Sequence, residues 1–379
     1  MSNLPTDNKV KKDKPKSSLR LFVKTLLISL GSFSVIIAIV AIVFFSIVRP
    51  PEIPSLTVAI TDGWGDGQST NGRPHQNSGN SQGSLDLPLS GLTAPERFTD
   101  DDRRDMVFTF LIIGLNEGRN ANTVMVASYD AVNRETNLIS IPRDIPVHPT
   151  RNGRKLSSSY LIGMGGGRGI AGGVAQVQRD VMTVIGFTPD FYVVIDYDAF
   201  FSIIDAVGGI EVYVPIRMWY DDPHQNLHID IQPGLQHMDS ATALDFARFR
   251  QANPGSGYPS LPDGDLGRVR NQQAVISAVI ERLLRPASLL RIPEFIGIFG
   301  DSVHTNLTTG NMLWFAGQLN NIRGRDALSA HTMPISHWGS RNNVSYGYLD
   351  AAAVVELVNK TINPFYQEIE LGDLSIIRE

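Results

Sequence analysis

The sequence contains no cysteine. This absence excludes disulfide bonds, thiolate metal sites and a cysteine nucleophile, so any folded domain must be stabilised by its hydrophobic core. The sequence contains no H-E-x-x-H pattern, and its one G-x-S-x-G match, at residues 79–83, lies in a polar Gly-, Ser- and Asn-rich stretch rather than between an apolar strand and a helix. Neither pattern therefore supports one of the commonest classes of hydrolase.

Charged side chains are absent from residues 25–48, TLLISLGSFSVIIAIVAIVFFSIV. About 20 apolar residues suffice for a helix to cross a bilayer. A cleaved secretory signal has a shorter apolar core, of about 7 to 15 residues, and a small-residue cleavage site. Here Arg49-Pro50-Pro51 follows the apolar run. The run therefore predicts a single transmembrane helix.

The first 24 residues are basic, with six Lys and one Arg against two Asp. Because basic residues stay on the cytoplasmic side, we expect a cytoplasmic tail at 1–24 and everything after residue 48 outside the cell membrane. The whole chain has a formal charge of −5, so the part beyond the basic tail is more acidic still. An acidic domain without a long basic stripe argues against nucleic acid as a partner.

The remainder divides by composition into three segments. Residues 49–104 centre on GWGDGQSTNGRPHQNSGNSQGSLD, which has too few apolar side chains to offset the entropy of ordering and predicts a flexible extracytoplasmic linker. Residues 105–364 are expected to form one globular domain, followed by a short C-terminal tail at 365–379.

Three apolar and β-branched runs open the expected domain, at 106–115, 123–130 and 136–142. The turns between them are short, so the runs predict neighbouring central strands. Later segments such as VRNQQAVISAVIERLL and AAAVVELVNKTI have helical periodicity. The irregular alternation of strands and helices favours a three-layer α/β or α+β sandwich over a barrel.

The third of these runs ends abruptly in Pro142, followed by Arg143 and Asp144. A proline that terminates a central strand places the next residues at its carboxyl end, the edge where open α/β sheets bind ligands. From these residues alone, a local ion pair that closes the strand end is an equally good interpretation.

Seven motifs occur in one order along the chain: IIGLNEGRNANTVMV, SIPRD, KLSSSY, VIDYDAFFSIIDAVGGIEV, IQPGLQHMDSATALDFARFR, DGDLGRVRNQQ and HTNLT. Together they resemble the LytR-CpsA-Psr family over about residues 107–310. The resemblance implies an extracytoplasmic enzyme on one N-terminal helix, with an α/β/α sandwich, a central mixed sheet and a lipid tunnel through its core. Such enzymes transfer glycopolymers, including teichoic acids, capsules and arabinogalactan, from a polyprenyl pyrophosphate carrier to peptidoglycan. The implied partners are thus the carrier lipid, an anionic glycopolymer, peptidoglycan and the membrane.

Binding a pyrophosphate requires several cations at one place, and guanidinium groups bind phosphate bidentately. The residues that match the family's basic and polar positions are Arg143, Lys155, Arg248, Arg250, Arg268 and Gln272, with Arg270 as a further candidate. Arg268 and Gln272 are four residues apart and therefore share one helix face. We expect Arg143, Asp144 and Asp265 to take part in catalysis.

At two positions this chain departs from the family, because Asn116 and Asn122 stand where the resemblance implies acidic ligands for Mg²⁺. An Asn donates a carbonyl oxygen without charge, so Mg²⁺ affinity should drop sharply. Either nearby carboxylates such as Glu117 and Asp265 replace them, or Arg119 supplies a fixed cation, or chemistry is lost. A non-catalytic protein that binds or presents the polyprenyl carrier therefore stands beside the transferase hypothesis.

Three other patterns occur along the chain. Residues 189–204, PDFYVVIDYDAFFSII, are rich in long apolar side chains and predict part of a lipid wall, although ordinary core packing explains them equally well. The G-x-G-x-x-G match at 167–172 lacks a preceding strand, which argues against a dinucleotide site. His224, His228 and Asp230 lie in a polar turn that favours solvated side chains over a zinc site.

Overall fold

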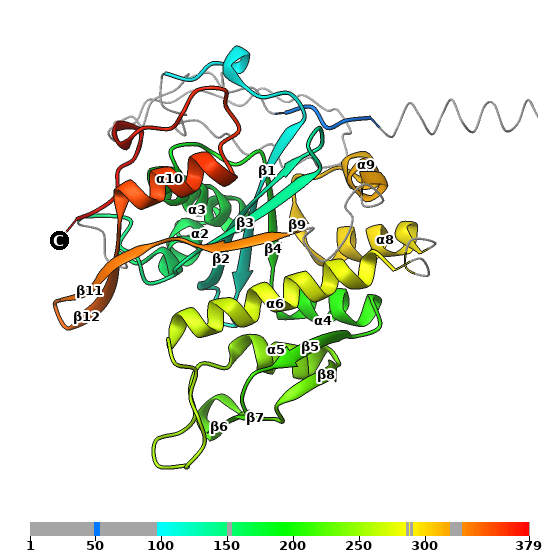
Figure 1. Ribbon diagram of the computed structural model, residues 1–379, viewed down its shortest axis with the longest axis vertical. Coiled ribbons are helices and arrows are strands. Elements are labelled where there is room, and N and C mark those ends of the chain that lie inside the picture. The colour runs from blue at the N-terminus through cyan, green and yellow to red at the C-terminus, as the bar shows by residue number, and fades with distance from the viewer. Residues whose placement is uncertain are drawn as a thin grey trace, which may run out of the picture. The chain divides into compact units, whose positions relative to one another are not determined.

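The computed structural model describes residues 49–53, 97–149, 154–285, 288, 291–318 and 328–378 (Figure 1). Within these ranges, none of the helices combines the length and hydropathy that a membrane span requires. The predicted cytoplasmic tail and the predicted transmembrane helix at 25–48 lie outside the described residues.

The strands are β1 (Val107–Leu115), β2 (Ala121–Asp130), β3 (Glu135–Ile141), β4 (Phe191–Ile195), β5 (Ile210–Val214), β6 (Met218–Asp222), β7 (Leu227–Ile231), β8 (Gly234–Met238), β9 (His304–Thr305), β10 (Ser329–Thr332), β11 (Ile335–Arg341) and β12 (Val344–Leu349). The helices are α2 (Ser159–Met164), α3 (Gly169–Ile185), α4 (Tyr197–Ala206), α5 (Ser240–Arg248), α6 (Asp265–Leu283), α8 (Ile292–Ser302), α9 (Thr309–Gln318) and α10 (Ala351–Thr361).

Six strands form the central sheet in the order β10-β3-β2-β1-β4-β9. The pairs β1–β2, β2–β3 and β4–β9 are antiparallel, whereas β1–β4 and β3–β10 are parallel. The central sheet is mixed, as the family resemblance implies, and its first three strands are neighbours, as the apolar runs predict. Since β1, β3 and β4 run in one direction, their carboxyl ends meet at one edge of the sheet.

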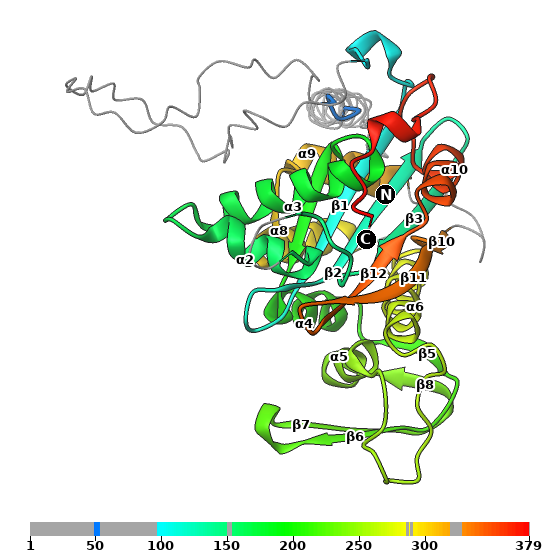
Figure 2. The ribbon, with the colours of Figure 1, turned by 90° about the vertical axis from the view of Figure 1, so that its left-hand side faces the viewer.

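Helices cover both faces of this sheet, which gives three layers (Figure 2). Along β1 the side chains alternate, and Leu111 and Ile113 join a core with Val177 of α3 and Val354 of α10. On the opposite face, the rings of α9 contact the phenylalanines of β1, with the Phe108 and Trp314 centroids 5.3 Å apart. Strand alternation thus divides one run of apolar residues between two cores.

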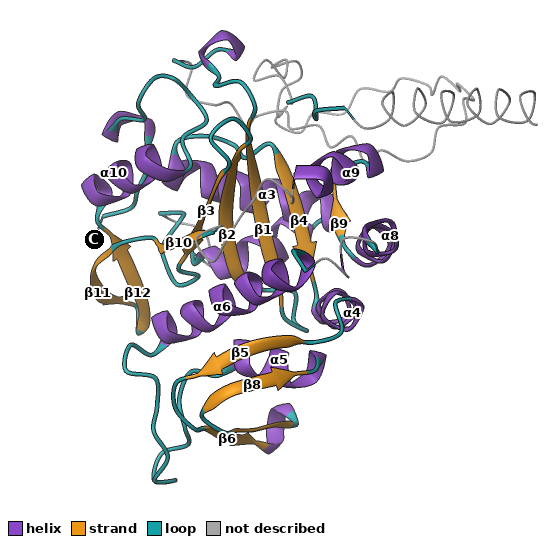
Figure 3. Ribbon diagram, turned by 45° about the vertical axis from the view of Figure 1, so that its right-hand side comes forward, coloured by secondary structure: helices purple, strands orange, loops and turns teal. Residues whose placement is uncertain are grey.

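Beside the sheet, β5–β8 and β6–β7 form two antiparallel ribbons that pack with α5 and α6 around a second core (Figure 3). Buried members of this core include Ile210, Met218, Phe246 and Val275. Helix α6 also contacts the central sheet, because Nε2 of Gln273 donates to Oγ of Ser140 on β3 at 2.9 Å. The same helix therefore joins the ribbons to the sheet.

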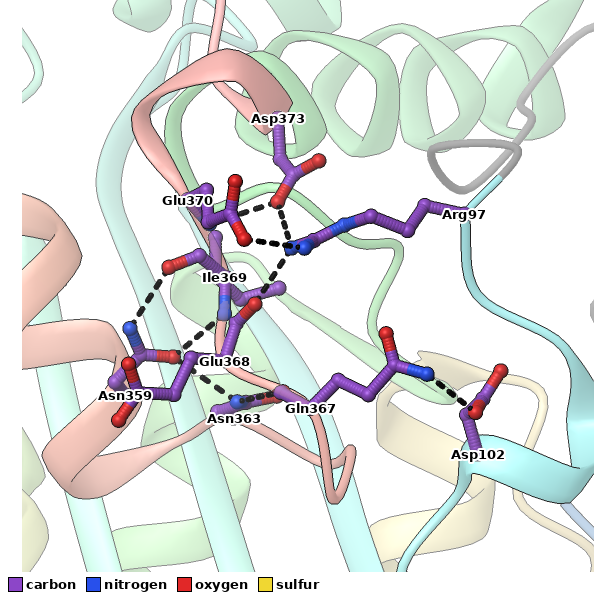
Figure 4. A network of polar contacts seen from close by, with 9 residues as sticks. All are labelled: Arg97, Asp102, Asn359, Asn363, Gln367, Glu368, Ile369, Glu370 and Asp373. Carbon is purple, nitrogen blue, oxygen red and sulfur yellow. Dashed lines mark hydrogen bonds and ion pairs between the residues drawn. The ribbon is translucent and has the colours of Figure 1, made fainter.

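The packed unit extends beyond the predicted bounds of 105–364 at both ends. The rings of Phe98 and Phe365 stack with centroids 4.2 Å apart, and both belong to the main core. Arg97 donates to Oε1 of Glu370 at 2.7 Å and also contacts Asp373 (Figure 4). Residues 97–104, which the sequence assigns to the linker, and residues 365–378, which it assigns to the tail, therefore pack as part of the domain.

Candidate functional site

A cavity of about 730 Å³ lies at the edge of the sheet where β1, β3 and β4 end and β2 begins. Its wall is completed by the ends of α5 and α6 and by the β6–β7 ribbon. Nine of the predicted site residues line it: Asn116, Asn122, Arg143, Asp144, Lys155, Arg248, Arg250, Arg268 and Gln272. Segments far apart in the sequence thus bring their polar side chains to one mouth.

Arg143 occupies the centre of the polar contacts at this mouth. Its Nη1 donates to Oδ1 of Asn122 at 2.8 Å. Its Nε lies 3.8 Å from Oδ2 of Asp144, and its Nη2 lies 3.7 Å from Oδ1 of Asp265. Strand β3 ends just before Pro142, so the guanidinium stands outside the sheet and is only 22% exposed. Arg143 is thus held by a neutral acceptor and by two looser ion pairs.

Lys155 is brought to the mouth by the segment that pairs with the residues after β3. Leu156 N donates to the carbonyl of Ile145 at 3.1 Å. The Lys155 ammonium donates to Oδ1 of Asp144 at 2.8 Å and lies 5.6 Å from the ring centroid of Tyr346. Asp144 is therefore closer to Lys155 than to Arg143, and the strand end carries a network of charges rather than one local ion pair.

Arg268 enters the cavity from the first turns of α6 and is 92% buried, since 8% of its surface is exposed. Its Nη2 lies 2.7 Å from Oδ1 of Asp265. Burial lowers the pKa of Arg268 to about 10; Asp265 and Asp144 oppose this shift, and Arg143 reinforces it. Because this pKa remains well above 7, the guanidinium is charged at neutral pH, while Asp265, which is not among the cavity-lining residues, positions it.

Two further arginines flank the end of α5. Arg248 is the last residue of that helix, and its guanidinium carbon lies 5.5 Å from the ring centroid of Tyr197. Phe249 leaves the helix in an extended conformation, is 1% exposed and separates Arg248 from Arg250. The two arginines therefore reach the cavity from a short segment anchored by a buried ring.

Some basic candidates do not reach the cavity. Arg270 is exposed, and its Nη2 donates to Oδ2 of Asp263 at 2.7 Å. Arg119 points to Met164, with Nη1 3.9 Å from Sδ, and does not line the cavity. Its predicted role as a substitute for the metal is therefore not favoured by its position.

Asn271 lies on α6 beside Gln272 but does not line the cavity. Its Nδ2 donates to the carbonyl of Phe246 at 3.0 Å, and it is 5% exposed. This hydrogen bond joins α6 to α5 away from the mouth. Gln272, the next residue, lines the cavity.

The residues present do not fit a site for Mg²⁺. Oδ1 of Asn116 accepts from the backbone N–H of Asn120 at 2.8 Å, and Oδ1 of Asn122 accepts from Arg143. The nearby carboxylates of Asp144 and Asp265 are paired with cations. Across the described residues, no group of three acidic, histidine or cysteine side chains is placed to hold a metal. The hard, anionic ligand set that Mg²⁺ prefers is therefore missing.

A second cavity, of about 390 Å³ and almost wholly apolar, lies between the sheet and helices α8 and α9. Ile112 of β1 lines both cavities. The segment 189–204, predicted as part of a lipid wall, contributes Val193 and Ile203 to this cavity. The same segment contributes Ile195 and Phe200 to the first cavity.

Sequence reasoning missed the contribution of the two helices, which supply Phe295, Phe299 and Phe315 to the apolar wall. The apolar spacing of IPEFIGIF was the available signal. It also missed Tyr197, which lines the polar cavity directly after β4. Burial raises the pKa of Tyr197, so its hydroxyl stays protonated at neutral pH. Asp196 accepts from Ala199 N at 2.9 Å and caps α4.

Comparison with known proteins gives relatives of modest identity. The regulatory protein MsrR of Staphylococcus aureus (strain COL) is 25% identical over 246 residues, which are 64% of this chain and 68% of that protein. A Bacillus cereus protein, polyisoprenyl-teichoic acid–peptidoglycan teichoic acid transferase TagU, is 26% identical over 258 residues, or 66% of this chain and 77% of that protein.

Solved structures agree on the fold. The crystal structure of Bacillus subtilis TagV has a TM-score of 0.55 at 23% identity and covers 68% of this chain and 96% of that chain. The structure of TagT bound to LIIa-WTA has a TM-score of 0.52 at 18% identity and covers 68% of this chain and 89% of that chain. A sequence profile described as the LytR_cpsA_psr family matches residues 76–363. The chain therefore belongs to the LytR_cpsA_psr family.

Proposed function

We propose that this protein transfers an anionic glycopolymer of the teichoic acid type from a polyprenyl diphosphate carrier to peptidoglycan. The observation that carries the proposal is the convergence of five cationic side chains on one cavity, with an apolar cavity behind it. The names of the relatives, which include teichoic acid transferases, support the same activity.

The polar cavity suits the diphosphate head group. Arg143 and Arg268 present planar guanidinium groups that can bind phosphate oxygens through two parallel hydrogen bonds. Both are largely withdrawn from water, with 22% and 10% of the side chain exposed. Reduced solvent screening strengthens their attraction for an anion. Lys155, Arg248 and Arg250 add positive charge around the opening.

The apolar cavity suits the isoprenoid tail. Its walls are formed by aliphatic and aromatic side chains, and Ile112 separates it from the polar cavity. Burying an isoprenoid chain is favourable by about 25 cal/mol for each Å² of apolar surface removed from water. A carrier lipid would thus place its tail between the sheet and α8, with the diphosphate at the mouth.

In the proposed reaction, a peptidoglycan hydroxyl oxygen bonds to the phosphorus that carries the glycopolymer. The bond from this phosphorus to the bridging oxygen breaks, and polyprenyl phosphate leaves with that oxygen. The proton of the hydroxyl passes to a carboxylate, for which Asp144 is the candidate that lines the cavity. Arg143 and Arg268 stabilise the charge that develops on the phosphates, and Asp265 positions Arg268.

We further propose that the domain works outside the cell membrane, on a single helix at 25–48 with the basic tail at 1–24 in the cytoplasm. The supporting observations are the uncharged apolar run and the basic residues before it. This placement would bring the cavity to the side of the membrane where peptidoglycan lies.

The test is transfer by the purified full-length chain in detergent. The chain would be incubated with a polyprenyl diphosphate-linked teichoic acid precursor and peptidoglycan, and the covalently linked polymer measured. We expect linked product and an equal amount of released polyprenyl phosphate. Absence of both products, while the precursor stays bound to the protein, would contradict the transferase.

That second outcome would favour a non-catalytic protein that binds the polyprenyl carrier. The observation that favours a non-catalytic protein is that the side-chain oxygens of Asn116 and Asn122 both accept hydrogen bonds from other groups of the protein. The two functions share the cavities and differ in whether a bond to phosphorus is broken, so product analysis separates them.

A further inference from the structure

The two asparagines at the mouth differ in what they hold. Asn116 closes its own turn, because its Oδ1 accepts from Asn120 N and its backbone carbonyl accepts from Arg119 N at 2.8 Å. Asn122 instead reaches across to the end of β3 and accepts from Nη1 of Arg143 at 2.8 Å. The second asparagine therefore orients a cation that faces the cavity.

A neutral acceptor adds no opposing charge to that cation beyond its two looser ion pairs with Asp144 and Asp265. An Asp at position 122 would form an ion pair with Arg143, and the pair would attract a diphosphate less strongly than the guanidinium alone. The amide oxygen of Asn122 gives the same directional hydrogen bond without the opposing charge. Nε of Arg143 is buried and makes no hydrogen bond within the described residues.

The charges that line the cavity are strongly biased to one sign. Five cationic side chains line it, together with two carboxylates, those of Asp144 and Asp196. Asp144 is paired with Lys155, and Asp196 accepts from a backbone N–H at the start of α4. Asp265, which does not line the cavity, pairs with Arg268. The four lining guanidinium groups outnumber this carboxylate and provide the charge that a divalent cation would otherwise supply to a diphosphate.

We propose that this site binds the diphosphate of its carrier without a divalent cation, with Arg143, oriented by Asn122, in place of the metal. This inference rests on the proposed function, since it concerns how the same head group is held. It concerns binding, and it adds no metal-dependent step to the reaction.

Binding of geranylgeranyl diphosphate to the full-length chain in detergent, measured by isothermal titration calorimetry, tests the inference. We expect the dissociation constants in EDTA and in MgCl₂ to agree within about threefold. A dissociation constant that rises more than about tenfold in EDTA would overturn metal-independent binding.

Asn122→Asp tests the role of the neutral acceptor. The new carboxylate would pair with Arg143, so we expect affinity in EDTA to fall by about tenfold or more. The matched control is Asn343→Asp, which adds the same charge at an exposed turn between β11 and β12. Affinity of Asn122→Asp equal to that of the control would contradict the assignment.

Arg143→Lys provides a second variant in case Asn122→Asp does not fold. This variant keeps the positive charge but loses the planar guanidinium that binds phosphate bidentately. We therefore expect the affinity for the diphosphate to fall by the same factor in EDTA and in MgCl₂. Recovery of wild-type affinity by Mg²⁺ alone would overturn the inference.

The failures of the two proposals are distinguishable. Binding that requires Mg²⁺ refutes metal independence and leaves the carrier-lipid function intact. No binding of the diphosphate in either buffer, by a folded chain, refutes the proposed function itself.

Discussion

At the scale of single residues, Arg268 and Arg270 occupy different faces of α6, although both are candidate phosphate-binding residues in the sequence. Arg268 lines the cavity and contacts Asp265, whereas Arg270 is about half exposed and pairs with Asp263. Residues two positions apart on an α-helix are separated by about 200° around its axis, so Arg268 and Arg270 face opposite sides of α6. The family pattern and the helical period together select Arg268, and burial gives it a lowered pKa of about 10.

Arg268→Lys should therefore weaken diphosphate binding by about tenfold or more, because a buried bidentate contact is lost and an ammonium is harder to desolvate. Arg270→Lys is the control and should change affinity by less than about twofold, since exposed ion pairs contribute little. Titration with geranylgeranyl diphosphate measures both. Equal losses in the two variants would contradict the assigned faces of α6.

At the scale of elements, glycines bring α2 and α3 together. The sequence GMGGGRGIAGG resembles a nucleotide loop in spacing, but two of its glycines, Gly163 and Gly172, lie at the contact between the two helices. A Cβ at Gly163 would overlap the carbonyl oxygen of Gly172 and lie 2.6 Å from Cβ of Gln176. Close backbone approach, rather than phosphate binding, accounts for the glycine at this position.

Gly163→Ala should lower the free energy of unfolding by about 1 to 3 kcal/mol, because α2 must move away from α3. Gly297→Ala in the middle of α8 is the control, since a Cβ there meets no atom within 4 Å. That change should be neutral or stabilise by up to about 1 kcal/mol, as Ala favours the helix over Gly. Urea denaturation measures the free energy of unfolding of both variants. If Gly163→Ala left this free energy unchanged, α2 and α3 would not be in close contact at Gly163.

At the scale of the whole domain, the first and last described segments close on one another. Phe98 stacks on Phe365, and Ile369 joins the same core. Arg103 is 2.5 Å from Asp190, which accepts from Thr109 at the start of β1. The residues after 364 are therefore expected to unfold together with the sheet.

Phe365→Ala should lower the free energy of unfolding by about 3 to 5 kcal/mol, the usual cost of removing a buried ring. Arg97→Ala should cost less than about 1 kcal/mol, since its contacts with Glu370 and Asp373 are solvent-exposed. Urea unfolding monitored by circular dichroism measures the free energy of unfolding of both variants. If Phe365→Ala cost no more than Arg97→Ala, the C-terminal segment would not be part of the cooperative unit.

The local pattern of the sequence was sufficient for much of the fold. Strands β1, β2 and β3 were predictable because buried strands require continuous apolar runs, and short turns make successive strands neighbours. Helices α6 and α10 were predictable from periodicity and end signals. The later strands β6 to β12 were not, since strand pairing in the ribbons and at the edges of the central sheet depends on contacts between segments whose own propensity is weak.

The sequence by itself determined which side chains could meet an anion: the arginines, Lys155 and the asparagines at 116 and 122 are visible as residue types in a known order. Only the tertiary structure decided that Asn122 holds Arg143, that Asn271 faces α5, and that α8 and α9 enclose an apolar cavity. The physical reason is range. Residue identity and periodicity are local properties, whereas the partner of a polar group and the walls of a cavity arise when distant segments pack against each other.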